Sequence, residues 1–226
     1  MTETIITSTL VNAPQAKQLA QQLTADFVPL KMITFESGEF YFEAPESLTG
    51  KTIILFQHIL FPVNETIIQL ALGMNAIRQR HAHKLILLIP YLPYSRQDRL
   101  HKPGAAIGAS VIAQLLQTAT PDALLVLDLH SLKIADYYNF PVINLESTSL
   151  IITDIQKRFS MSDICLVSPD AGGADRTQTI AAKLNVPCLS LTKERLNFNE
   201  LVIHNPGENF SDKICIFIDD MIDTGT

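Results

Sequence analysis

Short apolar runs alternate along this chain with segments whose apolar residues recur at helical spacing. The runs TIILFQ (52–57), KLILLIPY (84–91) and ALLVLDLH (123–130) are typical of strands buried in a sheet. Between them, residues 64–80 and 107–116 have the period of amphipathic helices. This alternation is typical of a mainly parallel sheet with helices on its faces. The sequence therefore predicts an α/β protein.

A second set of strand and helix patterns follows Tyr138. The runs PVINL, ICLVS, CLSL and KICIFI predict strands, and residues 149–159 and 173–184 predict helices. We therefore expect two similar α/β domains, at residues 1–140 and 141–226. The last run, which ends at Ile218, is expected to be covered on both faces.

Composition and charge narrow the possible partners and the compartment. The chain carries 17 Lys and Arg against 23 Asp and Glu, which argues against a nucleic-acid-binding protein. Neither a secretory signal nor an apolar run long enough to span a bilayer is found, so we expect no membrane partner and a cytoplasmic protein. Cys165, Cys188 and Cys215 each lie within an apolar run, which predicts buried free thiols.

Two polar segments follow predicted strands in the first half. YSRQDR places Arg96 and Arg99 around Gln97 and Asp98, and guanidinium groups bind polyphosphate oxygens in pairs. The alternative is a surface loop with a local Arg–Asp pair. DLH ends the next strand with His130, which is either a ligand or a structural histidine.

Two polar segments of the second half have both a functional and a structural interpretation. SPDAGG puts Asp170 after a strand and two glycines at the start of a helix. This arrangement could bind a metal and a phosphate, or it could be only a tight turn with a helix cap. TKERLNFNE places Lys193 and Arg195 on one side of an extended segment, which is either functional or a solvated charge run.

DDMIDTGT, the last eight residues, is the strongest single signal. Carboxylates can bind the hydroxyls of a ribose, while backbone amides and threonine hydroxyls surround a phosphate. A calcium loop would need alternating acids and a distal glutamate, which are absent from the segment. The groups concerned are Asp219, Asp220, Asp223, Thr224, Gly225 and Thr226.

Taken in order, six motifs resemble the ribose-phosphate pyrophosphokinase family: FESGEF, YSRQDR, DLH, SPDAGG, TKERL and DDMIDTGT. The resemblance covers residues 35–226, and KPGAAIG (102–108) is more similar to the shorter archaeal-type members. It implies two phosphoribosyltransferase-like domains with mainly parallel sheets flanked by helices, the ATP side first and the ribose-phosphate side second. It also implies an enzyme that requires magnesium and transfers the pyrophosphoryl group of ATP to C1 of ribose 5-phosphate. The products are AMP and phosphoribosyl pyrophosphate, for nucleotide biosynthesis.

The resemblance assigns roles by motif. It implies adenine contacts from Ser37 and Glu39, presented by a neighbouring subunit of a homo-oligomer. It also implies ATP contacts from Arg96 and Gln97, supported by Asp98 and Arg99, and a metal site with His130 and Asp170. The implied catalytic residues are Lys193 and Arg195, on a loop. The ribose phosphate would be bound by Asp219, Asp220, Asp223, Thr224, Gly225 and Thr226.

The sequence departs from the family pattern at three points. Ser37 stands where aspartate is common, and DTGT lacks a second glycine before the threonine. Family members also continue past this loop. The resemblance therefore implies an incomplete second domain, and we expect the 226-residue chain alone to be inactive.

Two other functions share part of this pattern. A non-catalytic regulatory relative would keep the fold but lose the catalytic segment, whereas Lys193 and Arg195 are present. A single phosphoribosyltransferase domain would share only the terminal loop and would not need YSRQDR or FESGEF. The enzyme is therefore the favoured hypothesis.

Overall fold

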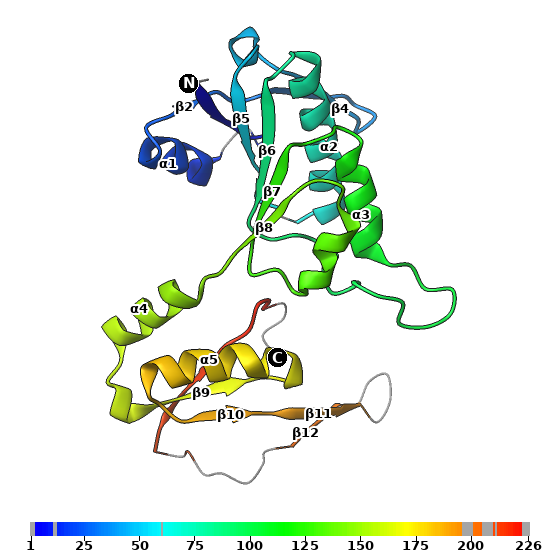
Figure 1. Ribbon diagram of the computed structural model, residues 1–226. Coiled ribbons are helices and arrows are strands. Elements are labelled where there is room, and N and C mark those ends of the chain that lie inside the picture. Colours follow the sequence, from blue (N-terminus) through cyan, green and yellow to red (C-terminus); the bar gives the residue numbers. More distant parts are fainter. Residues whose placement is uncertain are drawn as a thin grey trace. The chain divides into compact units, whose positions relative to one another are not determined.

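The computed structural model describes residues 3–10, 13–59, 61–195, 201–204, 210 and 212–222, with side chains left out at 192–195 and 201–204 (Figure 1). The chain forms two compact units, Met1–Leu145 and Glu146–Thr226. None of the helices in the described ranges has the length and apolar character needed to traverse a bilayer.

The first unit is built on a six-stranded sheet in which every pairing is parallel. Its strands, in the order β2-β1-β5-β6-β7-β8, are β2 (Asp26–Phe27), β1 (Thr4–Thr7), β5 (Thr52–Phe56), β6 (Lys84–Ile89), β7 (Ala123–Leu127) and β8 (Val142–Leu145). The helices are α1 (Pro14–Gln22), α2 (Val63–Gln79) and α3 (Gly108–Gln117), with short 3₁₀ turns at η1 (Glu46–Leu48) and η2 (Leu132–Tyr137).

Both faces of this sheet are covered, because successive strand residues point to opposite sides. Ile53 and Leu55 lie in the large core that also contains residues of α2 and α3. Their neighbours Ile54 and Phe56 pack in the smaller core with α1. Figure 1 shows α1 on one side of the sheet and α2 and α3 on the other. The α/β prediction is confirmed.

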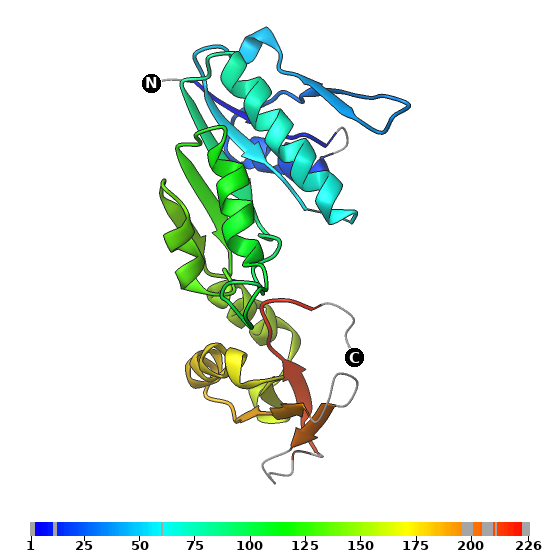
Figure 2. The ribbon, with the colours of Figure 1, turned by 90° about the vertical axis from the view of Figure 1, so that its right-hand side faces the viewer.

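A β-hairpin of β3 (Lys31–Thr34) and β4 (Phe40–Glu43) forms a small antiparallel sheet of its own. Phe42 is buried in the core with α2, whereas Phe35 and Tyr41 are about half exposed. In Figure 2 the hairpin extends past α2. The aromatic residues around FESGEF therefore belong to an internal hairpin that still leaves apolar surface exposed.

Gly73 in α2 packs closely against Thr9 of the segment after β1. A Cβ atom on Gly73 would lie 2.5 Å from Cγ2 of Thr9 and 3.1 Å from Cδ1 of Leu30. We expect Gly73→Ala to lower the free energy of unfolding by about 1–3 kcal/mol through overpacking, although Ala is the better helix former. Urea unfolding measures this, with the exposed Asn75→Ala in the same helix as control. A Gly73→Ala protein as stable as wild type would contradict the packing described here.

The second unit contains α4 (Thr148–Arg158) and α5 (Ala174–Leu184) with a parallel three-stranded sheet in the order β10-β9-β13. The strands are β10 (Cys188–Ser190), β9 (Ile164–Ser168) and β13 (Ile214–Phe217), and short 3₁₀ turns lie at η3 (Met161–Asp163) and η4 (Ala171–Gly173). A separate antiparallel hairpin pairs β11 (Thr192–Arg195) with β12 (Leu201–His204). Ile155 of α4 and Ile180 of α5 share one core with Leu166 of β9.

Three expectations about the second half are wrong in the described residues. PVINL was assigned to the second domain, but β8 pairs with β7 and completes the first sheet. The last strand is not covered on both faces: β13 is an edge strand of the described sheet, and Phe217 is 58% exposed. For the same reason only Cys165 is a buried free thiol, while Cys188 and Cys215 are exposed.

Candidate functional site

The carboxyl edge of the first sheet brings two of the predicted motifs together. Because β6 and β7 are parallel neighbours, the segments that follow them leave the sheet at the same edge. The amide of Leu127 donates to the carbonyl of Pro90 at 3.2 Å, which links the two strand ends. Arg96 and Gln97 follow β6 and are exposed, as is His130 after β7.

The segment Tyr94–Arg99, which we call the arginine loop, is held by hydrogen bonds at several points. Tyr94 has a positive φ of 62°, and its hydroxyl donates to Oδ1 of Asn64 at 2.6 Å. The amide of Gln97 donates to the carbonyl of Tyr94 at 2.9 Å, and the hydroxyl of Tyr137 donates to the carbonyl of Asp98 at 2.7 Å. The loop conformation is therefore fixed by contacts with α2 and η2.

The local Arg–Asp pair that offered a structural interpretation of the arginine loop is long. Nε of Arg99 lies 4.0 Å from Oδ1 of Asp98, and the Arg99 side chain is 79% exposed. A pair of this length and exposure contributes little to stability. The pair therefore gives little structural reason for Arg99.

The turn after β7 is fixed by the neighbouring strand. Asp128 has a positive φ of 47°, a conformation that is uncommon outside glycine. Its amide donates to the carbonyl of Leu145 at 2.9 Å, and the amide of Leu129 donates to Oδ1 of Asn144 at 2.8 Å. Sequence reasoning missed Asn144, although a polar residue inside the apolar run PVINL was a signal.

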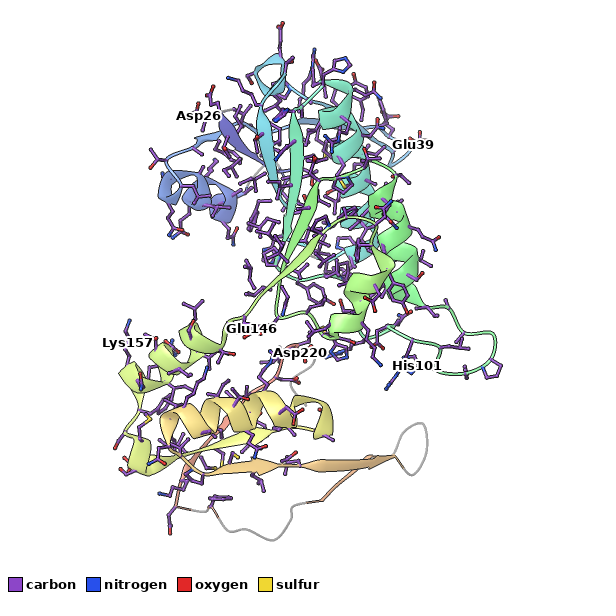
Figure 3. All side chains as sticks on the ribbon, viewed as in Figure 1. Asp26, Glu39, His101, Glu146, Lys157 and Asp220 are labelled. Atoms are coloured by element: carbon purple, nitrogen blue, oxygen red, sulfur yellow. The ribbon has the colours of Figure 1, made fainter. Side chains whose placement is uncertain are left out.

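Ser37 and Glu39 lie in the turn of the β3–β4 hairpin. The Ser37 hydroxyl donates to Oε2 of Glu39 at 3.0 Å and accepts from the Glu39 amide at 3.4 Å. Figure 3 shows Glu39 at the tip of the hairpin. Both residues are exposed. The hairpin therefore presents this polar pair to its surroundings.

Three carboxylates converge at the carboxyl edge of the second sheet. Oδ1 of Asp170, after β9, accepts from the amides of Gly172 and Gly173 at 3.0 and 3.2 Å, so the helix-cap role is real. Asp219 and Asp220 follow the neighbouring β13, and Figure 3 marks Asp220 there. Burial, and then the nearby Asp220 and Asp170, raise the pKa of Asp219, although the amide of Asp220 donates to it. The edge is thus a site of accumulated negative charge.

Because the pKa of Asp219 is raised on folding, its carboxylate destabilises the fold once it is ionised. The folded protein holds this proton more tightly than the unfolded chain, so stability is lost as the pH rises through the carboxyl range. We expect Asp219→Asn to raise Tm by about 1–3 °C at about pH 7.5 and to have little effect at about pH 4. The exposed Asp163→Asn is the control. A Tm that falls at the higher pH would contradict this assignment.

The structure describes only part of the remaining predicted residues. Lys193 and Arg195 lie in β11, opposite Ile203 and Leu201 of β12 in a regular antiparallel register. The expectation of a loop at these positions is therefore wrong, and their side chains are not described. Asp223, Thr224, Gly225 and Thr226 lie outside the described residues.

The predicted metal residues are divided between the units, His130 in the first and Asp170 in the second. Within the described part of the chain, no group of three or more His, Cys, Asp or Glu residues lies close enough together to hold a metal ion. Magnesium commonly binds through one or two carboxylates together with substrate phosphates. The acids at the second carboxyl edge fit this mode of binding rather than an all-protein cage.

Comparison with known proteins finds relatives over most of the chain. The family described as the N-terminal domain of ribose phosphate pyrophosphokinase matches residues 4–120. A ribose-phosphate pyrophosphokinase of Granulibacter bethesdensis is 32% identical over 214 residues, which cover 95% of this chain and 69% of that protein. Ribose-phosphate pyrophosphokinase 3 of Saccharomyces cerevisiae is 35% identical over 210 residues, covering 92% of this chain and 64% of that one.

A solved structure shares the fold over nearly the whole chain. The crystal structure of phosphoribosylpyrophosphate synthetase from Mycobacterium smegmatis matches with a TM-score of 0.87 and 27% identity. The match covers 99% of this chain and 73% of that one. The chain thus spans about two thirds to three quarters of the length of these three proteins.

Proposed function

The chain belongs to the ribose-phosphate pyrophosphokinase family, and we propose that the protein, meaning this sequence at the full length of its relatives, transfers the pyrophosphoryl group of ATP to the C1 hydroxyl of ribose 5-phosphate. The products are AMP and phosphoribosyl pyrophosphate, a precursor for nucleotide biosynthesis in the cytoplasm. The observation that carries the proposal is the position of the two motif sets. The arginine loop lies at the carboxyl edge of the first sheet, and the acids lie at that of the second.

The arginine loop supplies the ATP contacts in this proposal. Arg96 and Gln97 are exposed on a loop whose backbone is fixed, so little ordering is needed before they bind a triphosphate. Guanidinium groups donate to two phosphate oxygens at once and remain charged. Asp98 and Arg99 support this segment.

Asp219 and Asp220 bind the ribose in this proposal, together with the segment 223–226 that follows them. Carboxylates accept hydrogen bonds from sugar hydroxyls, and backbone amides surround the 5-phosphate. Burial and the nearby carboxylates raise the pKa of Asp219, and hydrogen-bond donors on the bound sugar would favour its ionised form.

Magnesium fits the same edge. Carboxylate oxygens are its preferred protein ligands, and Asp170 together with the phosphates of ATP would hold it. His130, at the carboxyl edge of the first sheet, is the second residue that we propose for metal binding. The ion would neutralise charge on the phosphate oxygens during transfer.

The chemistry requires positive charge where negative charge develops. The oxygen of the C1 hydroxyl attacks the β-phosphorus and its proton passes to solvent, while the bond from the β-phosphorus to the oxygen that bridges to the α-phosphorus breaks and AMP leaves with that oxygen. Lys193 and Arg195 would neutralise charge on the transferred group and on AMP as this bond breaks. Positioning and charge neutralisation account for catalysis without proton transfer by either residue.

A homo-oligomer is also part of the proposal, with Ser37 and Glu39 contacting the adenine bound to a neighbouring copy. A groove of about 370 Å³ between the hairpin and α2 supports it, because Tyr41 and Leu72 line the groove and are 47% and 39% exposed. Apolar surface of this kind suits a subunit contact. Light scattering is expected to show an oligomer, whereas an active monomer at all concentrations would reject the shared site.

Product analysis tests the proposed function against a non-catalytic regulatory relative. The protein at the full length of its relatives is incubated with ATP, Mg²⁺ and ribose 5-phosphate, and each component is omitted in turn. We expect AMP only when all three are present. A folded protein that binds ATP without forming AMP would support the regulatory alternative.

A further inference from the structure

Gly108, the first residue of α3, lies directly against the side chain of Gln97. A Cβ atom at this position would be 2.6 Å from Oε1 of Gln97 and 2.9 Å from Cδ1 of Tyr94. Real Cβ atoms do not approach other heavy atoms so closely. We propose that Gly108 is a positioning residue that determines where the Gln97 amide lies. The inference rests on the proposed function, in which Gln97 contacts ATP.

Backbone conformation does not explain a glycine here. Gly38, Gly50 and Gly104 have positive φ values, whereas Gly108 does not and any residue could adopt its backbone conformation. Its place in the helix does not require glycine either, because Gly108 is the first residue of α3 and not a left-handed residue that ends a helix. The feature that does require glycine is the space that the Gln97 amide occupies.

The surrounding hydrogen bonds decide which group would move if a methyl group were added. The backbone amide of Ala109 donates to the backbone carbonyl of Gln97 at 3.2 Å. The backbone amide of Gln97 donates to the carbonyl of Tyr94. The Tyr94 ring is tethered through its hydroxyl to Asn64. The Gln97 side chain is exposed and rotates about three bonds. A methyl group on residue 108 would therefore displace the flexible side-chain amide first, and it would also press on the Tyr94 ring, which can give less.

The position of the Gln97 side-chain amide matters for nucleotide binding, because the amide has both hydrogen-bond donors and an acceptor. It can recognise a nucleotide only if its oxygen and nitrogen point in defined directions. Gly108 thus acts on nucleotide affinity through Gln97, without touching the nucleotide. We expect the effect to appear in KM for ATP and not in kcat, since Gln97 is not among the groups that neutralise transition-state charge.

A double-mutant cycle tests the proposal. Gly108→Ala is expected to raise KM for ATP about 5- to 20-fold with kcat within about twofold. In a Gln97→Ala background the same substitution should change KM less than about twofold. Ser110→Ala, in the same helix turn, controls for helix propensity and should leave KM unchanged. A Gly108→Ala effect of equal size in both backgrounds would overturn the proposal.

A spectroscopic measurement separates this inference from the proposed function. The side-chain amide signals of Gln97, identified as those missing from the Gln97→Ala protein, are recorded in ¹⁵N-labelled, nucleotide-free protein. They should shift in Gly108→Ala and not in Ser110→Ala, and unshifted signals would overturn the steric claim. If the wild type forms no AMP while the signals do shift, the proposed function fails and the positioning of Gln97 by Gly108 stands.

Discussion

Replacing Lys193 with alanine is expected to lower kcat by about 10²- to 10³-fold, the range found when one group that stabilises transition-state charge is removed. KM for ATP should stay within about threefold, because Arg96 and Gln97 carry the ground-state contacts in our account. Folding should be unaffected, since residue 193 pairs with Ile203 through its backbone. Steady-state kinetics and a thermal unfolding curve measure both effects.

Lys183, an exposed lysine in the last turn of α5, provides the matched control. Lys183→Ala removes the same charge from the same unit and should leave kcat within about twofold. Near-normal turnover in Lys193→Ala would refute its catalytic role. A low kcat accompanied by a lower Tm would instead show that the β11–β12 hairpin had been damaged.

Asp170→Asn is expected to raise the Mg²⁺ concentration for half-maximal activity at least about 10-fold, because a charged ligand becomes a neutral one. The substitution is selective. An asparagine Oδ1 can still accept from the amides of Gly172 and Gly173, so the turn at the start of α5 is kept. Activity measured over a Mg²⁺ titration provides the readout.

Asp163→Asn, an exposed acid before β9, is the control and should leave the Mg²⁺ titration unchanged. Tm of Asp170→Asn should stay close to that of wild type, because asparagine can keep the two hydrogen bonds to the amides of Gly172 and Gly173. An unchanged Mg²⁺ requirement would show that Asp170 is only the helix cap.

Local pattern predicted most of the elements in this fold. The run TIILFQ became β5, and the helical period at 64–80 became α2, which begins one residue earlier. The sheet to which each strand belongs is harder to predict from sequence, because parallel pairing joins residues that are far apart along the chain. The strand Val142–Leu145 reads the same whether it pairs with β7 or begins a new sheet, and only the structure shows that it pairs with β7.

The hairpin at β11 was missed for a related reason. Thr192–Arg195 is polar, so it lacks the apolar run that indicates a strand, and its pairing with β12 depends on a segment further along the chain. Polar strands of this kind are stabilised by their partner and not by their own composition. Extended conformation was predicted for this segment, but pairing was not.

The residues of the candidate site likewise include some that the sequence predicts and others that it does not. Residues such as Arg96 and Asp170 stand out in sequence because their charged groups follow strands. The residues that hold the loops do not: Tyr137 donates to the carbonyl of Asp98, 39 positions away, and Asn144 accepts from the amide of Leu129, 15 positions away. Gly108 is identified only by the atoms around it. The candidate functional side chains could therefore be predicted from sequence, whereas the residues that position them could be identified only from the structure.

The fate of the β-phosphorus of ATP tests the central claim most directly. The protein is incubated with Mg²⁺, ribose 5-phosphate and ATP labelled at the β-phosphorus, and the products are separated. Our account predicts that all of the transferred label appears in phosphoribosyl pyrophosphate, with an equal amount of unlabelled AMP. Label retained in ADP, with a singly phosphorylated C1 in the sugar product, would show transfer of the γ-phosphoryl group alone and would contradict it.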